Sequence, residues 1–145
     1  MNELIKWISI ADRFNKMYLN KQFGRLGINS SQHMYILCIC ENEGITQDKL
    51  QAISYINKSN VTRALGQLEK AGFITKGPNK KDKRTIRLYP TEKAKYIYRE
   101  IIRIEDEWTA FLTKEFSDPE RKLLVSLIKK VGETAVEQRS GDEDE

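Results

Sequence analysis

The fold of this chain is decided by residues 57–88, which read NKSNVTRALGQLEKAGFITKGPNKKDKRTIRL. The first half of this stretch predicts an amphipathic helix, with Asn57 as its N-cap and Gly72 as its C-terminal stop. Three apolar side chains recur at helical spacing and should face the core: Val61, Leu65 and Leu68. Gly66 should destabilise this helix by about 1 kcal/mol relative to alanine. A close backbone approach is one explanation for a glycine at that position.

The other faces of this helix carry hydrogen-bonding side chains that suit the base edges and phosphates of DNA. They belong to Lys58, Ser59, Asn60, Thr62, Arg63 and Gln67. Residues 57–88 hold nine Lys or Arg residues against two acidic residues, so the positive charge of the chain is concentrated here. Such a surface is typical of a protein that binds duplex DNA.

A basic hairpin is predicted directly after the helix. Residues 73–76 and 85–89 have the pattern of two strands, and Gly77-Pro78-Asn79 should turn the chain between them. The tip consists of Lys80, Lys81, Asp82, Lys83 and Arg84. It must be solvated or lie on an anion, because burying unpaired charges is unfavourable. Asp82 is suited to hold the Arg84 guanidinium in one rotamer beside a polyanion; the alternative is a solvated tip that only keeps the protein soluble.

Length and composition predict one globular domain, since the chain has 145 residues of which 39% are hydrophobic. The net charge is +4, but the last four residues are all acidic. Residues 1–141 therefore hold 25 cations against 17 acids, a net charge of +8. This balance favours nucleic acid or an anionic surface as the partner, although it also fits a merely soluble protein. Residues 140–145 are expected to form a disordered acidic tail.

Several classes of protein are disfavoured by what the sequence lacks. No apolar run is long enough to span a membrane, and Glu3 and Lys6 stand where a signal peptide needs apolar residues. We therefore expect a cytoplasmic protein with no membrane partner. Neither metal-ligand spacing nor a glycine-rich phosphate loop nor an obvious nucleophile with its base is present. We expect no metal, no cofactor and no enzymatic activity.

The cysteines and the single histidine each have a structural and a functional interpretation. Cys38 and Cys40 lie in one predicted helix and point about 200° apart, so they cannot pair with each other. Buried structural thiols are the favoured interpretation, and a redox switch is the alternative. His33 is interpreted as a structural residue in preference to a ligand-binding one.

Caps and apolar spacing predict five further helices, at residues 3–23, 29–43 and 46–54 and after Thr91 and Ser117. The predicted caps are Asn29 with Gln32, Thr46, Asn57, Thr91, and Ser117 with Glu120. A tight Tyr55-Ile56 link joins the third helix to the basic helix, which is therefore the second helix of a helix-turn-helix. The basic hairpin adds a wing to this unit.

The outer helices carry apolar faces that need a partner. In the helix after Thr91, the apolar side chains form a continuous row, or seam, that lasts for more than two heptads. We expect a second copy of the chain to cover them, in a homodimer that uses Leu4, Ile8, Ile101, Ile104, Trp108, Leu124, Leu127, Ile128 and Val131. The alternative is packing of these helices within one chain. The predicted fold class is mainly α with a small β wing. Residues 29–90 would form a winged helix-turn-helix DNA-binding domain, and residues 1–28 and 91–139 a helical dimerisation region.

Several groups of residues in fixed order resemble the signature of the MarR family of bacterial and archaeal transcriptional regulators. They are Lys58 to Arg63, Leu68 to Ile74, Asp82 to Arg84 and Thr91 to Lys93. The specific part is the series S-x-x-T-R, L-E-x-x-G and D-x-R, while the outer helices match only in pattern. The resemblance covers nearly the whole chain. It implies a homodimer with one winged helix-turn-helix per subunit.

Carried over by position, the resemblance places Ser59, Asn60, Thr62 and Arg63 on a helix in the major groove. It places Arg84 in the adjacent minor groove, oriented by Asp82, and it has Lys80, Lys81 and Lys83 contact phosphates. The chain departs from the family pattern at the junction of wing and next helix, with Pro90 in place of Leu and Ala94 in place of Gly.

Many members of that family are similar in binding small phenolic or lipophilic anions between the DNA-reading and dimerisation regions, which releases DNA. Trp7, Tyr18 and His33 are candidates for such an effector site here, although each is equally satisfied as a core or surface residue. The inferred function is a homodimeric, sequence-specific transcriptional regulator, expected to be a repressor, that binds a pseudo-palindromic operator. The alternative is a winged-helix module that binds protein or RNA without reading duplex sequence.

Overall fold

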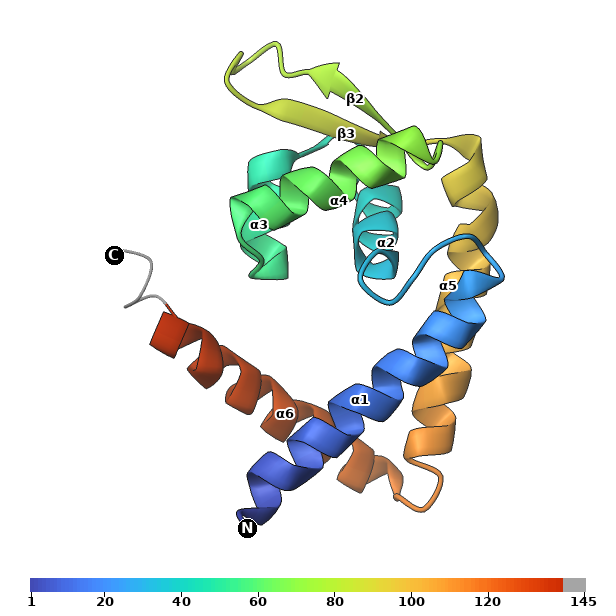
Figure 1. Cartoon of the computed structure of the whole chain (residues 1–145), viewed down its shortest axis with the longest axis vertical. Helices are drawn as coiled ribbons and strands as arrows, with labels where there is room; N and C mark the ends of the chain where they lie inside the picture. Colours follow the sequence, from blue (N-terminus) through green and yellow to red (C-terminus); the bar gives the residue numbers. More distant parts are fainter. Residues whose placement is uncertain (140–145) are drawn as a thin grey trace. The chain divides into compact units, whose positions relative to one another are not determined.

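The computed structural model describes residues 1–139, which form helices and one small sheet (Figure 1). The elements follow in the order α1 (Glu3–Gly24), α2 (His33–Glu41), β1 (Ile45–Thr46), α3 (Gln47–Ser54), α4 (Lys58–Lys70), β2 (Ile74–Pro78), β3 (Ile86–Pro90), α5 (Glu92–Leu112) and α6 (Asp118–Arg139). The predicted class, mainly α with a small β wing, is confirmed. The tail predicted at residues 140–145 lies outside the described residues.

The chain forms two compact units. The first runs from Met1 to Glu105 and contains the sheet, the first four helices and most of α5. The second begins at Asp106 and contains the end of α5 and all of α6. The proposed division into a DNA-binding domain at 29–90 and a dimerisation region around it stays a prediction.

The sheet has the strand order β1-β3-β2, with antiparallel pairing on both sides of β3. In the hairpin, Ile74 pairs with Pro90, and Pro78 pairs with Ile86. Gly77 and Pro78 thus continue β2, which corrects the prediction that they turn the chain. Proline has no backbone N–H to donate to a neighbouring strand. Pro78 is tolerated because β2 is an edge strand, where this missing donor interrupts no hydrogen bonds between strands. β1 has no counterpart in the prediction, because two residues are too few to show alternation.

Side-chain caps start α3, α4 and α6 as predicted. Thr46 Oγ1 accepts a hydrogen bond from the Lys49 N–H at 3.2 Å, and Asn57 Oδ1 accepts one from the Asn60 N–H at 2.9 Å. A capping box that begins at Ser117 starts α6. Each cap satisfies backbone donors that have no partner within the helix, which fixes where the helix begins.

The second helix begins four residues later than predicted. The Asn29 N–H does donate to Gln32 Oε1, at 3.0 Å, as in a capping box. However, Asn29 Oδ1 accepts from the N–H and the hydroxyl of Ser31, and residues 30–32 form a turn. Because this local bonding competes with helical geometry, α2 starts at His33.

Tyr55 makes the sharp turn between α3 and α4. Its φ is 57°, and it is the one non-glycine residue with positive φ among residues 1–139. Its N–H donates to the Gln51 carbonyl at 3.2 Å and so closes the end of α3. The chain then enters the Asn57 cap, which makes α4 the second helix of a helix-turn-helix.

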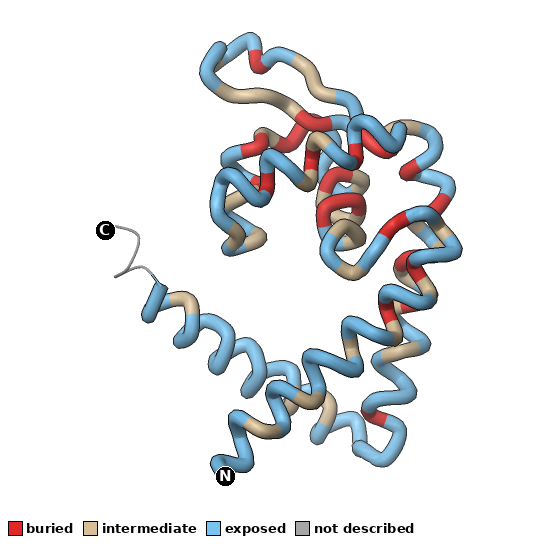
Figure 2. The backbone as a smooth tube through the Cα atoms, in the orientation of Figure 1, coloured by how far each residue is buried: buried red, intermediate tan, exposed pale blue. Residues whose placement is uncertain are grey.

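The first unit has a continuous core that contains the predicted apolar stripe of α4 (Figure 2). Val61, Leu65 and Leu68 are fully buried. The core is completed by large side chains from other elements, among them Phe23, Tyr35, Ile36, Phe73 and Leu88. α4 contacts β2, and α2 contacts β3. α4 therefore packs directly on the first strand of the wing.

Two residues of the predicted dimer seam are buried within this core instead. Ile101 and Ile104 on α5 are 0% and 4% exposed. Both side chains are buried within a single chain, and their assignment to a dimer interface stays a prediction. The other seam residues are exposed or half-buried, namely Leu4, Ile8, Trp108, Leu124, Leu127, Ile128 and Val131. No described residue of α6 is buried.

Candidate nucleic-acid interface

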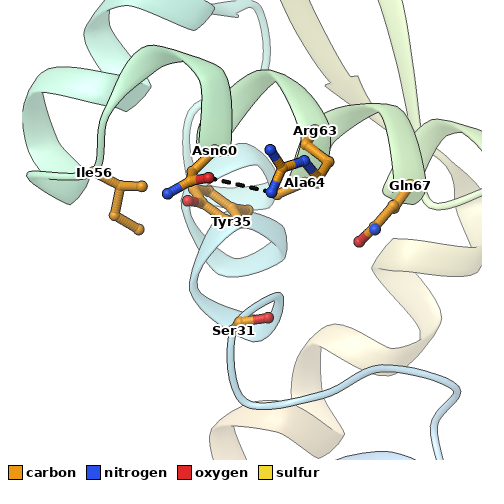
Figure 3. Close-up of a pocket in the computed structure, with 7 residues that line it drawn as sticks. All are labelled: Ser31, Tyr35, Ile56, Asn60, Arg63, Ala64 and Gln67. Carbon is orange, nitrogen blue, oxygen red and sulfur yellow. Dashed lines mark hydrogen bonds between the residues drawn. The ribbon is translucent and has the colours of Figure 1, made fainter.

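One flank of α4 faces a cavity of about 380 Å³ beside the start of α2 (Figure 3). The cavity is lined by Ser31, Tyr35, Ile56, Asn60, Arg63, Ala64 and Gln67. Arg63 Nη1 donates to Asn60 Oδ1 at 3.3 Å, which holds the guanidinium beside the amide. The structure therefore brings together three of the predicted DNA contacts, Asn60, Arg63 and Gln67.

The hydroxyl of Thr62, another predicted contact, is hydrogen-bonded inside the protein. Thr62 Oγ1 donates to the Lys58 carbonyl at 2.8 Å and accepts from Gln47 Nε2 at 2.9 Å. Gln47 is the first residue of α3 and is buried. Sequence reasoning missed Gln47, because a contact between residues 15 positions apart on two helices leaves no local pattern.

Ser59 and Gly66 complete the outward part of α4. Ser59 is exposed, and its hydroxyl donates to Asn57 Oδ1 at 2.9 Å. A Cβ added at Gly66 would meet no atom within 4 Å among the described residues. A close approach by another part of the chain is therefore not the reason for this glycine.

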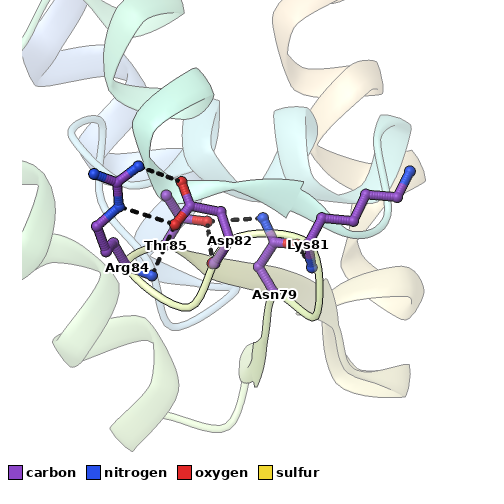
Figure 4. A network of polar contacts seen from close by, with 5 residues as sticks. All are labelled: Asn79, Lys81, Asp82, Arg84 and Thr85. Carbon is purple, nitrogen blue, oxygen red and sulfur yellow. Dashed lines mark hydrogen bonds and ion pairs between the residues drawn. The ribbon is translucent and has the colours of Figure 1, made fainter.

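Asp82 holds Arg84 in a fixed orientation at the tip of the wing (Figure 4). The Asp82 carboxylate accepts hydrogen bonds from Arg84 Nε at 3.1 Å, from Nη2 at 3.3 Å and from the backbone N–H at 3.0 Å. The side-chain and backbone hydrogen bonds from Arg84 lower the pKa of Asp82 below its ordinary value. The Arg84 side chain is 89% exposed. The predicted contact is confirmed, and it presents an oriented cation at the surface.

Asn79 organises the turn that carries this pair. The residue is buried, and its Nδ2 donates to Thr85 Oγ1 at 2.8 Å. Asn79 Oδ1 accepts from the Lys81 N–H at 3.1 Å, and the Thr85 hydroxyl lies 3.2 Å from the Asp82 carbonyl, to which it donates. These bonds tie the two sides of the tip together, while its charged side chains face the solvent.

The wing carries further cations besides Arg84. Lys80, Lys81 and Lys83 are exposed, as predicted for charges that cannot be buried. Lys80 and Lys81 also line a cavity of about 230 Å³ together with Pro78, Asn79, Arg87 and Tyr89. Arg87 is structural, because its Nη1 donates to the Gly44 carbonyl at 2.7 Å and ties β3 to the loop before β1. The free lysines give the wing a positive potential suited to a polyanion.

Comparisons with known proteins agree with this geometry. A model of the MarR family matches residues 28–86. The HTH-type transcriptional regulator YybA of Bacillus subtilis is 30% identical over 131 residues, which cover 90% of this chain and 87% of that protein. The chain belongs to the MarR family. The transcriptional repressor MprA of Escherichia coli K12 is also 30% identical, over 74% of this chain and 67% of that protein.

Solved structures of MarR-family proteins share the fold of most of the chain. One is a MarR-family transcriptional regulator from Listeria monocytogenes in complex with a 26mer DNA. It is 35% identical with a TM-score of 0.86, and the match covers 95% of this chain and 92% of that one. The present protein is thus a DNA-binding transcriptional regulator of the MarR family and not an enzyme.

The three effector candidates of this MarR-family chain lie apart from the cavity beside α4. Trp7 on α1 is exposed, and its Nε1 donates to Glu3 at 3.0 Å. Tyr18 is half-buried on the same helix. His33 stacks on Phe23 with ring centroids 4.6 Å apart. None of the three residues lines either cavity described above, so the structure does not bring them together there.

Both nitrogens of His33 have partners, which fits the structural interpretation. Nδ1 lies 2.9 Å from the Ser30 carbonyl, and Nε2 lies 3.1 Å from Glu105 Oε1 on α5. The ring therefore links α2 to α5 within the first unit. A histidine with both nitrogens engaged has no free position for a ligand.

The two cysteines of this regulator are free and half-buried. Burial raises the pKa of both thiols, and nearby Glu41 raises that of Cys38 further. Because the thiolate is the reactive form, these cysteines are poor nucleophiles at neutral pH. Among residues 1–139, no helix has the length and hydropathy needed to span a membrane, and no cluster of three His, Cys, Asp or Glu side chains is placed to hold a metal ion.

Proposed function

We propose that this regulator is a homodimeric repressor that binds a pseudo-palindromic operator. α4 of each subunit would enter a major groove, and Arg84 of each wing an adjacent minor groove. The observation that carries the proposal is the Arg84 guanidinium, which Asp82 orients and which stays exposed on a hairpin with three further exposed cations. The Listeria relative in complex with DNA and the relative named a repressor support this choice of ligand and outcome.

The side chains of α4 divide into base readers and phosphate contacts. Arg63 and Asn60 are paired on one flank and offer donors and an acceptor to base edges. Lys58 and the wing lysines carry mobile point charges, which suit phosphates. Ser59, Thr62 and Gln67 complete the proposed interface.

The exposed apolar side chains on α1 and α6 support a homodimer. Leu4 is 60% exposed, Ile128 61% and Val131 45%. Leaving such side chains in water is unfavourable, by about 1.5 to 3 kcal/mol for each one that a partner would fully bury. Residues 1–28 and 91–139 would form the dimerisation region, with Ile101 and Ile104 serving its internal packing.

Sedimentation of a charge variant tests the dimer. Ile128→Glu should shift the protein from dimer to monomer at micromolar concentration, because a carboxylate would have to be buried in the interface. Ser126→Glu adds the same charge to an exposed polar position of α6 and should leave the dimer intact. Identical sedimentation of the two variants would remove α6 from the proposed interface.

A small aromatic anion is proposed as the effector. The cavity beside α4 is a better candidate for its binding site than the three residues expected from the sequence. Its volume, about 380 Å³, lies within the usual range for small-molecule sites. Arg63 supplies a cation for a carboxylate, and Tyr35 supplies an aromatic wall. A ligand bound to Arg63 would compete with DNA for the same guanidinium and so release the operator.

Calorimetry with a panel of aromatic acids tests the effector site. Ala64→Leu fills part of the cavity and should abolish binding, whereas Ala71→Leu adds the same volume at the exposed end of α4 and should not. Equal binding by both variants would place the effector elsewhere. No binding by the unaltered protein would exclude these acids as effectors.

Duplex titration tests the function itself. Arg63→Ala should lower affinity for a selected operator by about 1 to 3 kcal/mol and reduce the preference over scrambled duplex. Lys81→Ala should weaken both duplexes alike, since Lys81 uses only its backbone N–H inside the protein and alanine retains it. An unchanged preference in Arg63→Ala would defeat its assignment as a base reader. Structured RNA that competes as well as operator would favour a general interaction module.

A further inference from the structure

The contact between Gln47 and Thr62 restricts what the Thr62 hydroxyl offers to a ligand. Gln47 is 7% exposed, and its Nε2 lies 2.9 Å from Thr62 Oγ1. Thr62 itself is exposed on the surface of α4. A buried amide on α3 is therefore attached to a hydroxyl at the edge of the proposed DNA-reading surface.

A hydroxyl has one proton and two lone pairs. In the observed arrangement the Thr62 proton goes to the Lys58 carbonyl at 2.8 Å, and one lone pair accepts from Gln47. If the amide is turned over, Gln47 presents its oxygen at the same place, and the Thr62 proton goes to that oxygen. In both arrangements the proton is used within the protein. The side chain then has only acceptor capacity left for a ligand.

Gln47 is held in a way that makes this restriction firm. Its Oε1 is buried and has no hydrogen-bond partner among the described residues. Among residues 1–139, Thr62 Oγ1 is therefore the one hydrogen-bond partner of an amide that solvent hardly reaches. Moving Thr62 Oγ1 away from the Lys58 carbonyl would break this bond and leave the amide nitrogen unsatisfied as well, which is unfavourable. Ser59 differs, because both it and its acceptor on Asn57 are exposed and water can replace their bond.

We propose that Thr62 reads DNA as a hydrogen-bond acceptor only, because the Lys58 carbonyl takes its proton, and that Gln47 is the positioning residue that keeps Thr62 Oγ1 beside this carbonyl. The inference rests on the proposed DNA-binding function. Of the groups in the major groove, the adenine N6 and cytosine N4 amino groups donate, whereas guanine O6, thymine O4, the purine N7 atoms and the phosphates only accept. Thr62 thus recognises an exocyclic amino group and cannot hydrogen-bond the keto oxygens, the N7 atoms or a phosphate.

The inference predicts which base atoms matter at one position of the operator. Thr62→Val removes the hydroxyl but keeps the shape of the side chain. The base pair read by Thr62 is the operator position at which this variant loses the base preference of the unaltered protein. Deleting the amino group there, with purine in place of adenine, should weaken binding by the unaltered protein by about two- to ten-fold, the size of one hydrogen bond. Replacing N7 of the same purine by carbon should change the affinity by less than two-fold.

Variants of both residues separate the hydroxyl from other effects. For Thr62→Val, deleting the amino group should lower the affinity only through its effect on the duplex itself. The ratio between the affinity losses of the unaltered protein and of Thr62→Val then measures the contact made by the hydroxyl. Gln47→Met removes the amide but keeps the length of the side chain. It removes the bond that keeps Thr62 Oγ1 beside the Lys58 carbonyl, so the Thr62 side chain should adopt another rotamer and donate, and the N7 replacement should now weaken binding at that position.

The outcomes distinguish the inference from the proposed function. If the unaltered protein binds no duplex in preference to another, both fail. If it binds but the N7 replacement weakens it and the amino deletion does not, the function stands and the inference is overturned. A double-mutant cycle for unfolding adds a readout independent of DNA. Gln47→Met and Thr62→Val should be coupled in stability, and strict additivity would show that no such hydrogen bond exists in solution.

Discussion

Replacing Gly66 by alanine should stabilise this regulator, which is an unusual expectation for a change within a DNA-reading helix. Gly66 lies inside α4, and a Cβ placed there meets no atom within 4 Å. The substitution therefore brings the benefit of a better helix former without a steric cost. For an open helix position this gain is about 0.5 to 1 kcal/mol. For a chain of this length it corresponds to a rise in Tm of roughly 1 to 4 °C.

Gly72 provides the matched control at the end of the same helix. Its φ is +83°, in the left-handed region, and a Cβ there would lie 3.9 Å from Lys93 Cδ, an ordinary contact. The cost of Gly72→Ala is therefore one of backbone conformation, about 1 to 2 kcal/mol of stability. A methyl group added inside α4 and one added just after its end should therefore change stability in opposite directions.

Thermal and urea unfolding of the three proteins at one fixed concentration measures both effects, because the stability of an oligomer depends on concentration. A loss of stability in Gly66→Ala would show that another group approaches this position in solution. A gain in Gly72→Ala would show that α4 does not end in the left-handed turn. Either result would refute the description of α4 on which the interface depends.

Further predictions concern the cap, the core and the wing. Asn57→Ala should cost about 0.5 to 2 kcal/mol in urea unfolding, since it removes the acceptor for the Asn60 N–H. Leu65→Ala should cost about 2 to 5 kcal/mol by the same method, because Leu65 is fully buried. The contact of Asp82 with Arg84 lowers the pKa of Asp82, so it should be fully present above the ordinary carboxyl pKa and lost as the pH falls through the lowered value. NMR titration of the Arg84 Nε–H measures this, and a contact that survives protonation of Asp82 would contradict it.

Much of α4 and the wing could be predicted from the sequence because their determinants are local. Asn57 caps three residues ahead, the apolar stripe recurs at helical spacing, and Asp82 lies two positions before Arg84. Each of these patterns lies within a stretch of sequence shorter than three turns of a helix. The caps of α3 and α6 were within reach of the same reasoning.

The features that the sequence left undetermined depend on contacts between distant segments. Gln47 meets Thr62 across two helices, and β1 exists only because its two residues pair with β3. The apolar face of α5 predicts burial, but the pattern does not say against what. In the structure, Ile101 and Ile104 are buried within the first unit. A dimer in which a second chain covered them would give the same sequence pattern. The cavity beside α4 likewise needs Ser31 and Tyr35 to be placed by the tertiary fold.

We propose that α4 and the wing bind neighbouring grooves of one duplex, twice in each dimer. Hydroxyl-radical and methylation footprinting on a duplex selected from a random pool tests it most directly. We expect two protected major-groove segments about one helical turn apart, each flanked by a protected minor groove whose protection disappears in Arg84→Ala. A selected duplex with no protected positions, or with minor-groove protection that persists in Arg84→Ala, would contradict it.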